Sequence, residues 1–179
     1  ARWQDGPQRT PEPVRRLADE GVREAREALA AEGYFSALVS FSLDRDRERA
    51  QAVADEVGGH ALTVDVADPD ATTAAVGAAA EAMGGLTDVI ATAGIGRNEP
   101  LHLYSDKEWR LVVGVNLDGT FLTFREAARH MIERGEGGSL IAIGSVSAIH
   151  GAPGNEAYSA SKAAVASLIR GLAIELARH

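Results

Sequence analysis

The chain has 179 residues, 45% of them hydrophobic, which suits one folded domain with an apolar core and is too short for two comfortable ones. Its net charge of −8 argues against nucleic acid or an anionic membrane as the main partner, and the absence of cysteine excludes disulfides, thiolate catalysis and zinc–cysteine sites. Because no apolar run could span a bilayer and the N-terminus lacks a signal-peptide core, we expect a cytoplasmic protein with no membrane partner.

The first 33 residues predict no strand. Residues 1–10 are polar, contain proline and glycine, and are expected to form an arm. Apolar residues recur at helical spacing over 13–31, which predicts one amphipathic helix, with Pro11 and Pro13 suited to its first turn and Gly33 to its end. We therefore separate an atypical N-terminal arm and amphipathic helix, 1–33, from the rest of the chain, 34–179.

From residue 34 onward, short apolar runs alternate with helical segments. Strands are predicted over 34–41, 60–64, 88–92 and 139–143. Helices are predicted over 44–57, from the Asp68-Pro69-Asp70 start to Gly84, from Ser105 or Asp106 to Arg134 with a bend near Gly114 or Gly119, and from Asn155 to the C-terminus. This alternation predicts an α/β fold, a Rossmann-like parallel sheet with helices on both faces. The sheet is expected to be incomplete, because its first strand and its C-terminal strands are not evident.

Tyr158 and Lys162 lie four residues apart on the last predicted helix, so both side chains share one face. A phenol is a poor base at neutral pH unless a neighbouring cation favours the phenolate. The lysine one turn away supplies such a cation. Alone, however, this spacing is common, and it usually reflects a half-buried tyrosine beside a solvated lysine.

Two further polar residues suit the same chemistry. Ser145 follows the apolar strand 139–143, at the carboxyl end where open α/β sheets bind ligands, and Asn116 in the long helix could offer a carbonyl or amide to a water chain. Alone, Ser145 is more often a turn former and Asn116 a capping residue, but the joint occurrence and order of all four residues make chance improbable. The five histidines have no metal-ligand spacing, so no metal is predicted.

Together these segments resemble the short-chain dehydrogenase/reductase family. The resemblance rests on Val115-Asn116-Leu117, on Gly144-Ser145, on Tyr158-Ser-Ala-Ser-Lys162, on Asp65-Val66 after the second predicted strand, and on Thr92-Ala93-Gly94, where the family usually has Asn-Ala-Gly. It implies that residues 34–179 are a partial Rossmann-like catalytic domain of an oxidoreductase that interconverts a secondary alcohol and a ketone.

The resemblance also implies a role for each residue. Tyr158 would be the acid/base, Lys162 would favour its phenolate and hold the nicotinamide ribose, Ser145 would polarise the carbonyl, and Asn116 would carry a proton relay. The cofactor would be NAD or NADP, bound by Asp65, Val66, Thr92, Ala93, Gly94, Val115, Tyr158 and Lys162. The substrate would be a small-molecule carbonyl compound or alcohol.

The glycine turn that such a cofactor needs is not found in the sequence. Alignment of the helix end near Gly33 places that turn at 15–22, where only Gly21 remains and Asp19 and Glu20 would repel phosphate. Two prolines exclude a central strand before it. After the strand at 34–41 the family usually has an acidic or basic residue that distinguishes the adenosine ribose of NAD from that of NADP. Asp44 and Arg45 come slightly later, so NAD and NADP stay open.

Three functions therefore stay open. The chain is part of a nicotinamide-dependent enzyme, or a cofactor-free relative that uses Ser145, Tyr158 and Lys162 for proton transfer or carbonyl binding, or a non-catalytic oligomerising remnant. Because the family's later strands have no counterpart after the last helix, we favour a piece of a longer enzyme over a natural remnant. A homodimer or homotetramer is expected through the helices at 106–134 and 155–178, whose apolar residues recur at helical spacing.

Overall fold

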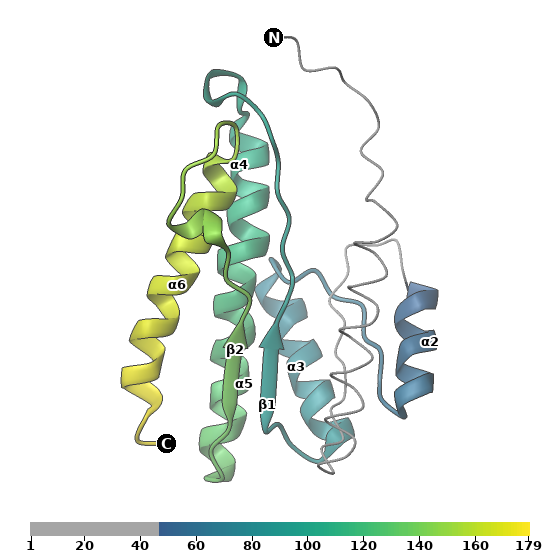
Figure 1. Ribbon diagram of the computed structural model, residues 1–179. Helices are drawn as coiled ribbons and strands as arrows, with labels where there is room; N and C mark the ends of the chain where they lie inside the picture. Colours follow the sequence, from purple (N-terminus) through teal and green to yellow (C-terminus); the bar gives the residue numbers. More distant parts are fainter. Residues whose placement is uncertain (1–46) are drawn as a thin grey trace. The chain divides into compact units, whose positions relative to one another are not determined.

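A computed structural model describes residues 47–179 and the side chains of residues 50–179 (Figure 1). The elements, in chain order, are α2 (Arg47–Val57), α3 (Pro69–Met83), β1 (Asp88–Ala91), the 3-10 turn η1 (Leu101–Leu103), α4 (Asp106–Val113), the π-helical turn η2 (Gly114–Asp118), α5 (Gly119–Arg134), β2 (Ser139–Ala142), the 3-10 turn η3 (Val146–Ala148) and α6 (Glu156–Leu176). The predicted arm, the helix at 13–31 and the strand at 34–41 lie outside the described residues.

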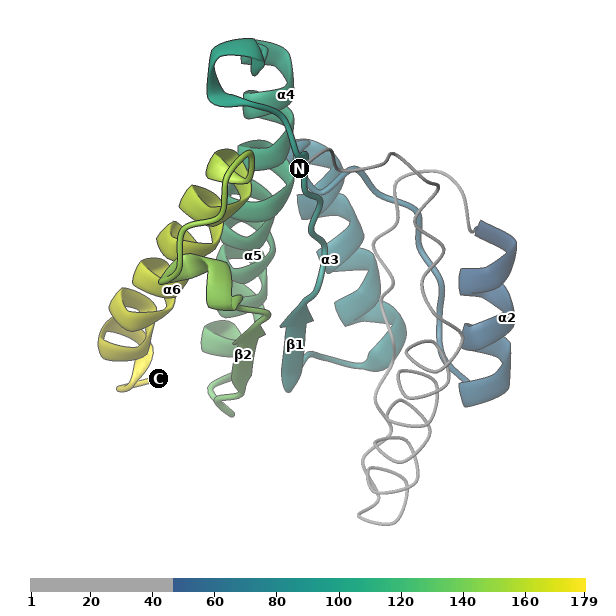
Figure 2. The same ribbon diagram turned by 45° about the horizontal axis from the view of Figure 1, so that its top comes forward.

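Strands β1 and β2 pair in parallel, with Asp88 opposite Ser139 and Ala91 opposite Ala142. This confirms the predicted parallel sheet. Helices α3, α5 and α6 lie on one face of the two strands (Figures 1 and 2). Alternate strand residues point to opposite faces. Thus Ala91 is buried, whereas Ile90 and Ile141 are 49% and 44% exposed.

The predicted strand at 60–64 is wrong for this structure, because these residues form no regular strand. A strand is defined by the hydrogen bonds of a neighbour, and within the described residues β1 pairs with β2 alone. The other strand predicted before α3, 34–41, lies outside the described residues. Val64 is nevertheless buried, as expected for the apolar run.

Helix α3 begins and ends at the predicted residues. The Asp68 carboxylate accepts hydrogen bonds from the backbone N–H groups of Asp70 (2.9 Å) and Ala71 (3.0 Å), and Pro69 occupies the first turn, where it has no hydrogen bond to lose. Gly84 ends the helix in the left-handed conformation, with φ of 71°, which glycine adopts at little cost.

The long helix predicted from 105 to 134 is confirmed, with a change of pitch in place of a simple bend. Ser105 caps α4 by accepting a hydrogen bond from the Glu108 N–H (3.2 Å). Between α4 and α5 the chain makes the π-helical turn η2, which is bounded by the two glycines at which a bend was predicted. Such turns widen the helix by one residue and often mark functional sites.

Gly119 begins α5 at the closest approach of the helix to the segment that precedes α3. A Cβ at this position would lie 2.7 Å from Cγ2 of Val66 and 3.2 Å from its carbonyl oxygen. Real Cβ atoms do not approach other atoms so closely, so the absence of a side chain at Gly119 allows the buried cluster of Val64, Val66 and Val115 to form beside η2.

G119A should therefore destabilise the protein by about 1–3 kcal/mol, because an added methyl group in a packed core forces its neighbours to shift. Gly77, in the interior of α3, has open space around its Cβ position. Since alanine favours a helix over glycine by about 1 kcal/mol, the matched variant G77A should be neutral or stabilising. Urea unfolding of both variants tests the contrast, and equal midpoints would contradict it.

No helix in the described residues is long and apolar enough to cross a membrane. Nor do residues 50–179 contain a group of three or more His, Asp or Glu side chains placed to hold a metal ion.

Candidate active site

Asn116 is fully buried in η2, and its amide binds the backbone of the loop that follows β1. Its Oδ1 accepts a hydrogen bond from the Ile95 N–H (2.8 Å), and its Nδ2 donates to the Ile95 carbonyl (2.9 Å). The backbone carbonyl of Asn116 accepts from Thr120 Oγ1 (2.8 Å). The side chain that sequence reasoning associated with a water chain thus fixes the loop at residue 95.

Ser161 supplies the third partner of this amide. Asn116 Nδ2 donates to Ser161 Oγ (2.9 Å), and the Ser161 hydroxyl in turn donates to the Tyr158 carbonyl (2.7 Å). Ser161 is 1% exposed. A buried amide of this kind is stable only when its hydrogen-bonding groups are satisfied, and here both N–H groups and the oxygen have partners.

Lys162 is 6% exposed, and its Nζ donates to the Ile143 carbonyl at the end of the β2 segment (2.7 Å). The same nitrogen lies 5.9 Å from the centre of the Tyr158 ring, and 3.6 Å from the position that a Cβ would take at Gly94. Within the described part of the chain, no carboxylate lies at ion-pair distance from this ammonium group. Lys162 is therefore a buried cation that faces the tyrosine and the loop after β1.

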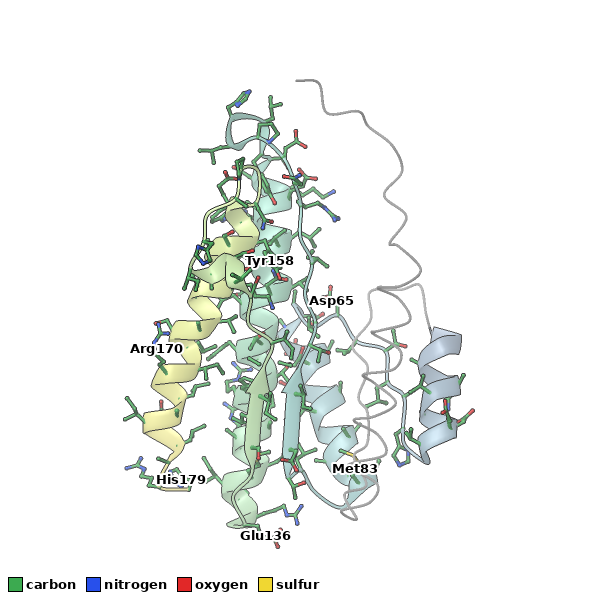
Figure 3. All side chains as sticks on the ribbon, in the orientation of Figure 1. Asp65, Met83, Glu136, Tyr158, Arg170 and His179 are labelled. Atoms are coloured by element: carbon green, nitrogen blue, oxygen red, sulfur yellow. The ribbon has the colours of Figure 1, made fainter. Side chains whose placement is uncertain are left out.

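Tyr158 is half-buried one helical turn before Lys162 on α6. Its ring lies against Gly96, where an added Cβ would sit 3.7 Å from Cδ2. Figure 3 shows Tyr158 beyond the carboxyl ends of the strands, on the side away from Glu136 and His179. The spacing-based prediction of a shared face for Tyr158 and Lys162 is confirmed.

Ser145 lies just beyond β2 and is half-buried. Its Oγ accepts a hydrogen bond from the Ser147 N–H (3.1 Å) and thereby begins η3, which packs against α6. The carboxyl end of β2 and the tyrosine-bearing helix are thus neighbours. The Ser145 oxygen caps the turn, and its O–H group makes no hydrogen bond within residues 50–179.

Three of the predicted cofactor residues belong to one apolar cluster. Val66 and Val115 are buried together with Val64, and Ala93 and Ile95 pack against them. This contact brings the segment before α3, the loop after β1 and η2 together.

Three further predicted cofactor residues, Asp65, Thr92 and Gly94, lie at the surface. Asp65 is exposed, and its carboxylate accepts from the Ala67 N–H (3.0 Å) in a local turn. Thr92 and Gly94 are exposed in the loop after β1. In Figure 3, Asp65 and Tyr158 lie on either side of that loop. Asp65, Thr92 and Gly94 are therefore exposed, whereas Lys162 is buried and Tyr158 is half-buried.

Sequence reasoning missed Ser161 and the backbone groups of Ile95 and Ile143. A buried small polar residue three positions after the tyrosine, on the helix face that carries Lys162, is the one signal that could have indicated Ser161. The two backbone groups carry no side-chain signal, because every residue has the same amide and carbonyl.

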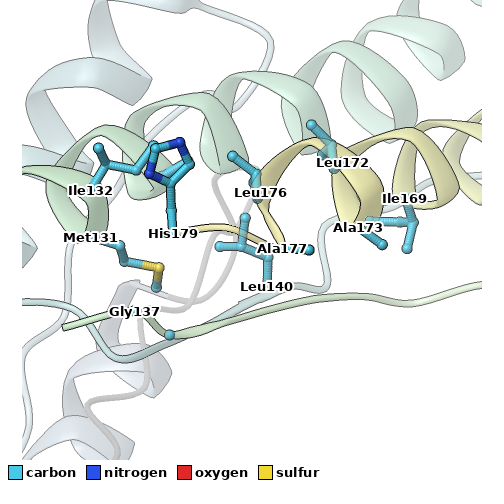
Figure 4. Close-up of a pocket in the computed structure, with 12 residues that line it drawn as sticks. Met131, Ile132, Gly137, Leu140, Ile169, Leu172, Ala173, Leu176, Ala177 and His179 are labelled. Atoms are coloured by element: carbon cyan, nitrogen blue, oxygen red, sulfur yellow. The ribbon is translucent and has the colours of Figure 1, made fainter. Parts of the chain in front are cut away.

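An apolar cavity of about 250 Å³ lies elsewhere, among the ends of α5 and α6 and the start of β2 (Figure 4). Its lining includes Met131, Ile132, Leu140, Leu172 and Leu176, with His179 at its edge. It lies at the amino end of β2, away from Tyr158, and holds none of the predicted site residues. We therefore place the candidate site at the opposite, carboxyl end of the strands.

Comparison with known proteins agrees with this geometry. The family model for short chain dehydrogenases matches residues 21–179. The L-rhamnose 1-dehydrogenase (NAD(P)(+)) of Azotobacter vinelandii is 36% identical over 89% of this chain and 64% of its own length. A protein named inactive 2-(S)-hydroxypropyl-CoM dehydrogenase 2, from Xanthobacter autotrophicus, is 38% identical over 74% of this chain and 58% of its own.

A solved structure gives the same result. The crystal structure of a short chain dehydrogenase from Mycobacterium smegmatis superposes with a TM-score of 0.70 at 28% identity, over 73% of this chain and 56% of that one. The chain belongs to the short-chain dehydrogenase/reductase family, and its fold is the Rossmann type of that family. It spans less than two thirds of the length of each of these relatives.

Proposed function

We propose that this chain is part of an oxidoreductase that interconverts a secondary alcohol and a ketone with NAD(H) or NADP(H). The observation that carries the proposal is the buried ammonium group of Lys162, placed one helical turn from Tyr158 and beside the loop after β1. A buried cation without a carboxylate partner is costly. Such a stability cost is typical of groups that are retained for function.

The residues divide the chemistry as follows. In reduction, the Tyr158 hydroxyl donates a proton to the carbonyl oxygen, and in oxidation the phenolate takes it from the alcohol. The Lys162 ammonium group lies beside this tyrosine, 5.9 Å from the centre of its ring. Ser145, whose O–H is not engaged within the described residues, donates to the same carbonyl oxygen and polarises it. A bound nicotinamide supplies the hydride chemistry, which no side chain of the protein can provide.

In this proposal the cofactor lies along the loop after β1, from Asp65 to Lys162. The exposed Asp65 would contact the adenosine end of the cofactor. Thr92 and Gly94 are also exposed and leave the backbone of the loop after β1 accessible to the cofactor. Lys162 would hold the nicotinamide ribose through the two N–H groups that are not bonded to Ile143. The region predicted to meet the pyrophosphate, 15–22, lies outside the described residues.

NADH or NADPH should raise the melting temperature of the purified chain. A ligand at one hundred times its Kd stabilises a protein by about 2.7 kcal/mol, which for a chain of this size means a rise of roughly 5–10 °C. ATP at the same concentration is the control for general nucleotide effects. If neither dinucleotide shifts the melting temperature beyond ATP, the nucleotide-dependent function is wrong for this chain.

A cofactor-free relative is the second candidate. Ser145, Tyr158 and Lys162 form an acid–base set that could catalyse enolisation or dehydration without a nicotinamide. The Xanthobacter relative is itself named as an inactive dehydrogenase. Under this function Y158F abolishes an activity that added NADH or NADPH does not change.

We also propose a homodimer or homotetramer in the cytoplasm, assembled through α4–α5 and α6. Some of the apolar residues at helical spacing on these helices, including Phe124, Met131 and Val165, are core residues and cannot take part. Exposed Phe121 and Ile132 on α5 and Ile174 on α6 remain available. A monomer by light scattering at micromolar concentration would contradict the oligomer.

A further inference from the structure

We propose that Ser161 is a positioning residue, which sets the orientation of the Asn116 amide and thereby fixes the loop after β1 against Tyr158 and Lys162. The proposal rests on the function proposed above, in that the loop is taken to border the nicotinamide. Ser161 does not touch the reacting atoms. Its effect passes through Asn116 and Ile95.

The orientation argument starts from the single hydrogen of the Ser161 hydroxyl. That hydrogen is donated to the Tyr158 carbonyl, three residues earlier on α6 (2.7 Å). Toward Asn116 the hydroxyl can therefore only accept, and it accepts from Nδ2 (2.9 Å). The serine thus requires the nitrogen end of the amide to face it.

The loop requires the same orientation. With Nδ2 toward Ser161, the Asn116 oxygen faces the Ile95 N–H (2.8 Å) while the nitrogen also reaches the Ile95 carbonyl (2.9 Å). The reversed amide would set its oxygen against two acceptors, Ser161 Oγ and the Ile95 carbonyl, and its nitrogen against a donor. Ser161 and Ile95 lie 66 positions apart in the sequence, yet both act on one amide.

The loop that this amide holds lines the candidate site. Gly94 lies beside the Lys162 ammonium group, and Gly96 lies against the Tyr158 ring. Ile95, the residue bound by Asn116, stands between them. Because Ser161, Asn116 and Ile95 form one continuous chain of hydrogen bonds, loss of the serine hydroxyl removes one of the three hydrogen bonds that hold the amide and thereby loosens the loop at that point.

Ser159 provides a matched control on the same helix. Its Oγ is also buried, but within the described residues it has no hydrogen-bond partner. S159A and S161A therefore remove the same atom at positions two residues apart on α6. Both variants change a serine of α6 to alanine, so the changes in helix propensity and in side-chain volume are equal. A difference in Ile95 exchange between the two variants is therefore due to the hydrogen bonds of Ser161.

The test is hydrogen exchange of the Ile95 amide, followed by NMR in the whole 179-residue protein. S161A should accelerate exchange about tenfold, the equivalent of one ordinary hydrogen bond, and S159A should leave it within twofold of the wild type. Equal exchange in S161A and the wild type, or equal acceleration in both variants, overturns the proposal.

A second pair of variants covers the case in which S161A does not fold. S161T and S161V have the same shape and differ only in the hydroxyl group. S161T should keep the Ile95 protection and S161V should lose it or fail to fold. An S161T variant that does not fold, or that exchanges at the rate of S161V, overturns the proposal as well.

Turnover separates this proposal from the function on which it rests. If the wild type is active with NADH or NADPH, S161A should lower kcat about 10- to 100-fold, because misplacement of a site by about 1 Å can cost about 10²-fold. S159A should leave kcat unchanged. Fast Ile95 exchange with an unchanged kcat refutes the positioning role. If the wild type shows no nucleotide effect, the proposed function fails and exchange alone still decides whether Ser161 orients Asn116.

Discussion

Y158F should lower kcat of the nucleotide-dependent reaction by about 10²- to 10⁴-fold, the usual contribution of a positioned general acid or base. Phenylalanine keeps the ring that packs against Gly96 and removes only the hydroxyl that carries the proton. The melting temperature should therefore stay close to that of the wild type. Steady-state kinetics with a panel of ketones and both reduced nucleotides gives the first value, and thermal unfolding gives the second.

Y104F is the control for loss of a tyrosine hydroxyl. The Tyr104 hydroxyl is buried without a hydrogen-bond partner among the described residues. Burial, together with the neighbouring carboxylate of Glu108, raises the pKa of Tyr104 above its ordinary value, so it stays protonated at neutral pH. Y104F should leave kcat unchanged. If Y104F and Y158F are equally impaired, the effect is structural and Tyr158 is not the acid.

The elements that the sequence predicted correctly are those with local signals. Asp68 and Ser105 begin their helices through side-chain hydrogen bonds to residues two or three positions later, and Gly84 ends α3 through its own backbone conformation. Each signal acts within one helical turn, so a single sequence contains it. The segment 60–64 has the same apolar character as β1, but a strand also needs a partner, and that requirement is not local.

In the candidate site, likewise, local features could be predicted from the sequence and long-range contacts could not. Tyr158 and Lys162 share a helix, so their spacing alone places them on one face. The contacts of Asn116 and Lys162 with the carbonyls of Ile95 and Ile143 span 21 and 19 residues, and involve backbone groups that any residue could supply. Sequence patterns can therefore predict candidate catalytic side chains, whereas the backbone groups that orient them follow only from the fold.

K162M should abolish nucleotide-dependent turnover, lowering kcat/KM at least about 10²-fold, while leaving the free energy of unfolding unchanged or slightly raised. The physical reason is that the Lys162 ammonium group is 6% exposed and, within the described residues, bonds only to the Ile143 carbonyl. Methionine fills a similar volume without a charge to desolvate.

K107M is the matched control, because Lys107 is the other lysine of the chain and lies exposed on α4. It should change neither turnover nor stability. If replacement of a residue lowers activity without lowering stability, the residue is retained for its chemical role. The native protein then accepts a lower stability than it could have without that residue. If K162M instead unfolds at much lower urea than K107M, the lysine stabilises the end of β2 through Ile143. Its burial would then be structural, and the observation that carries the proposed function would lose its force.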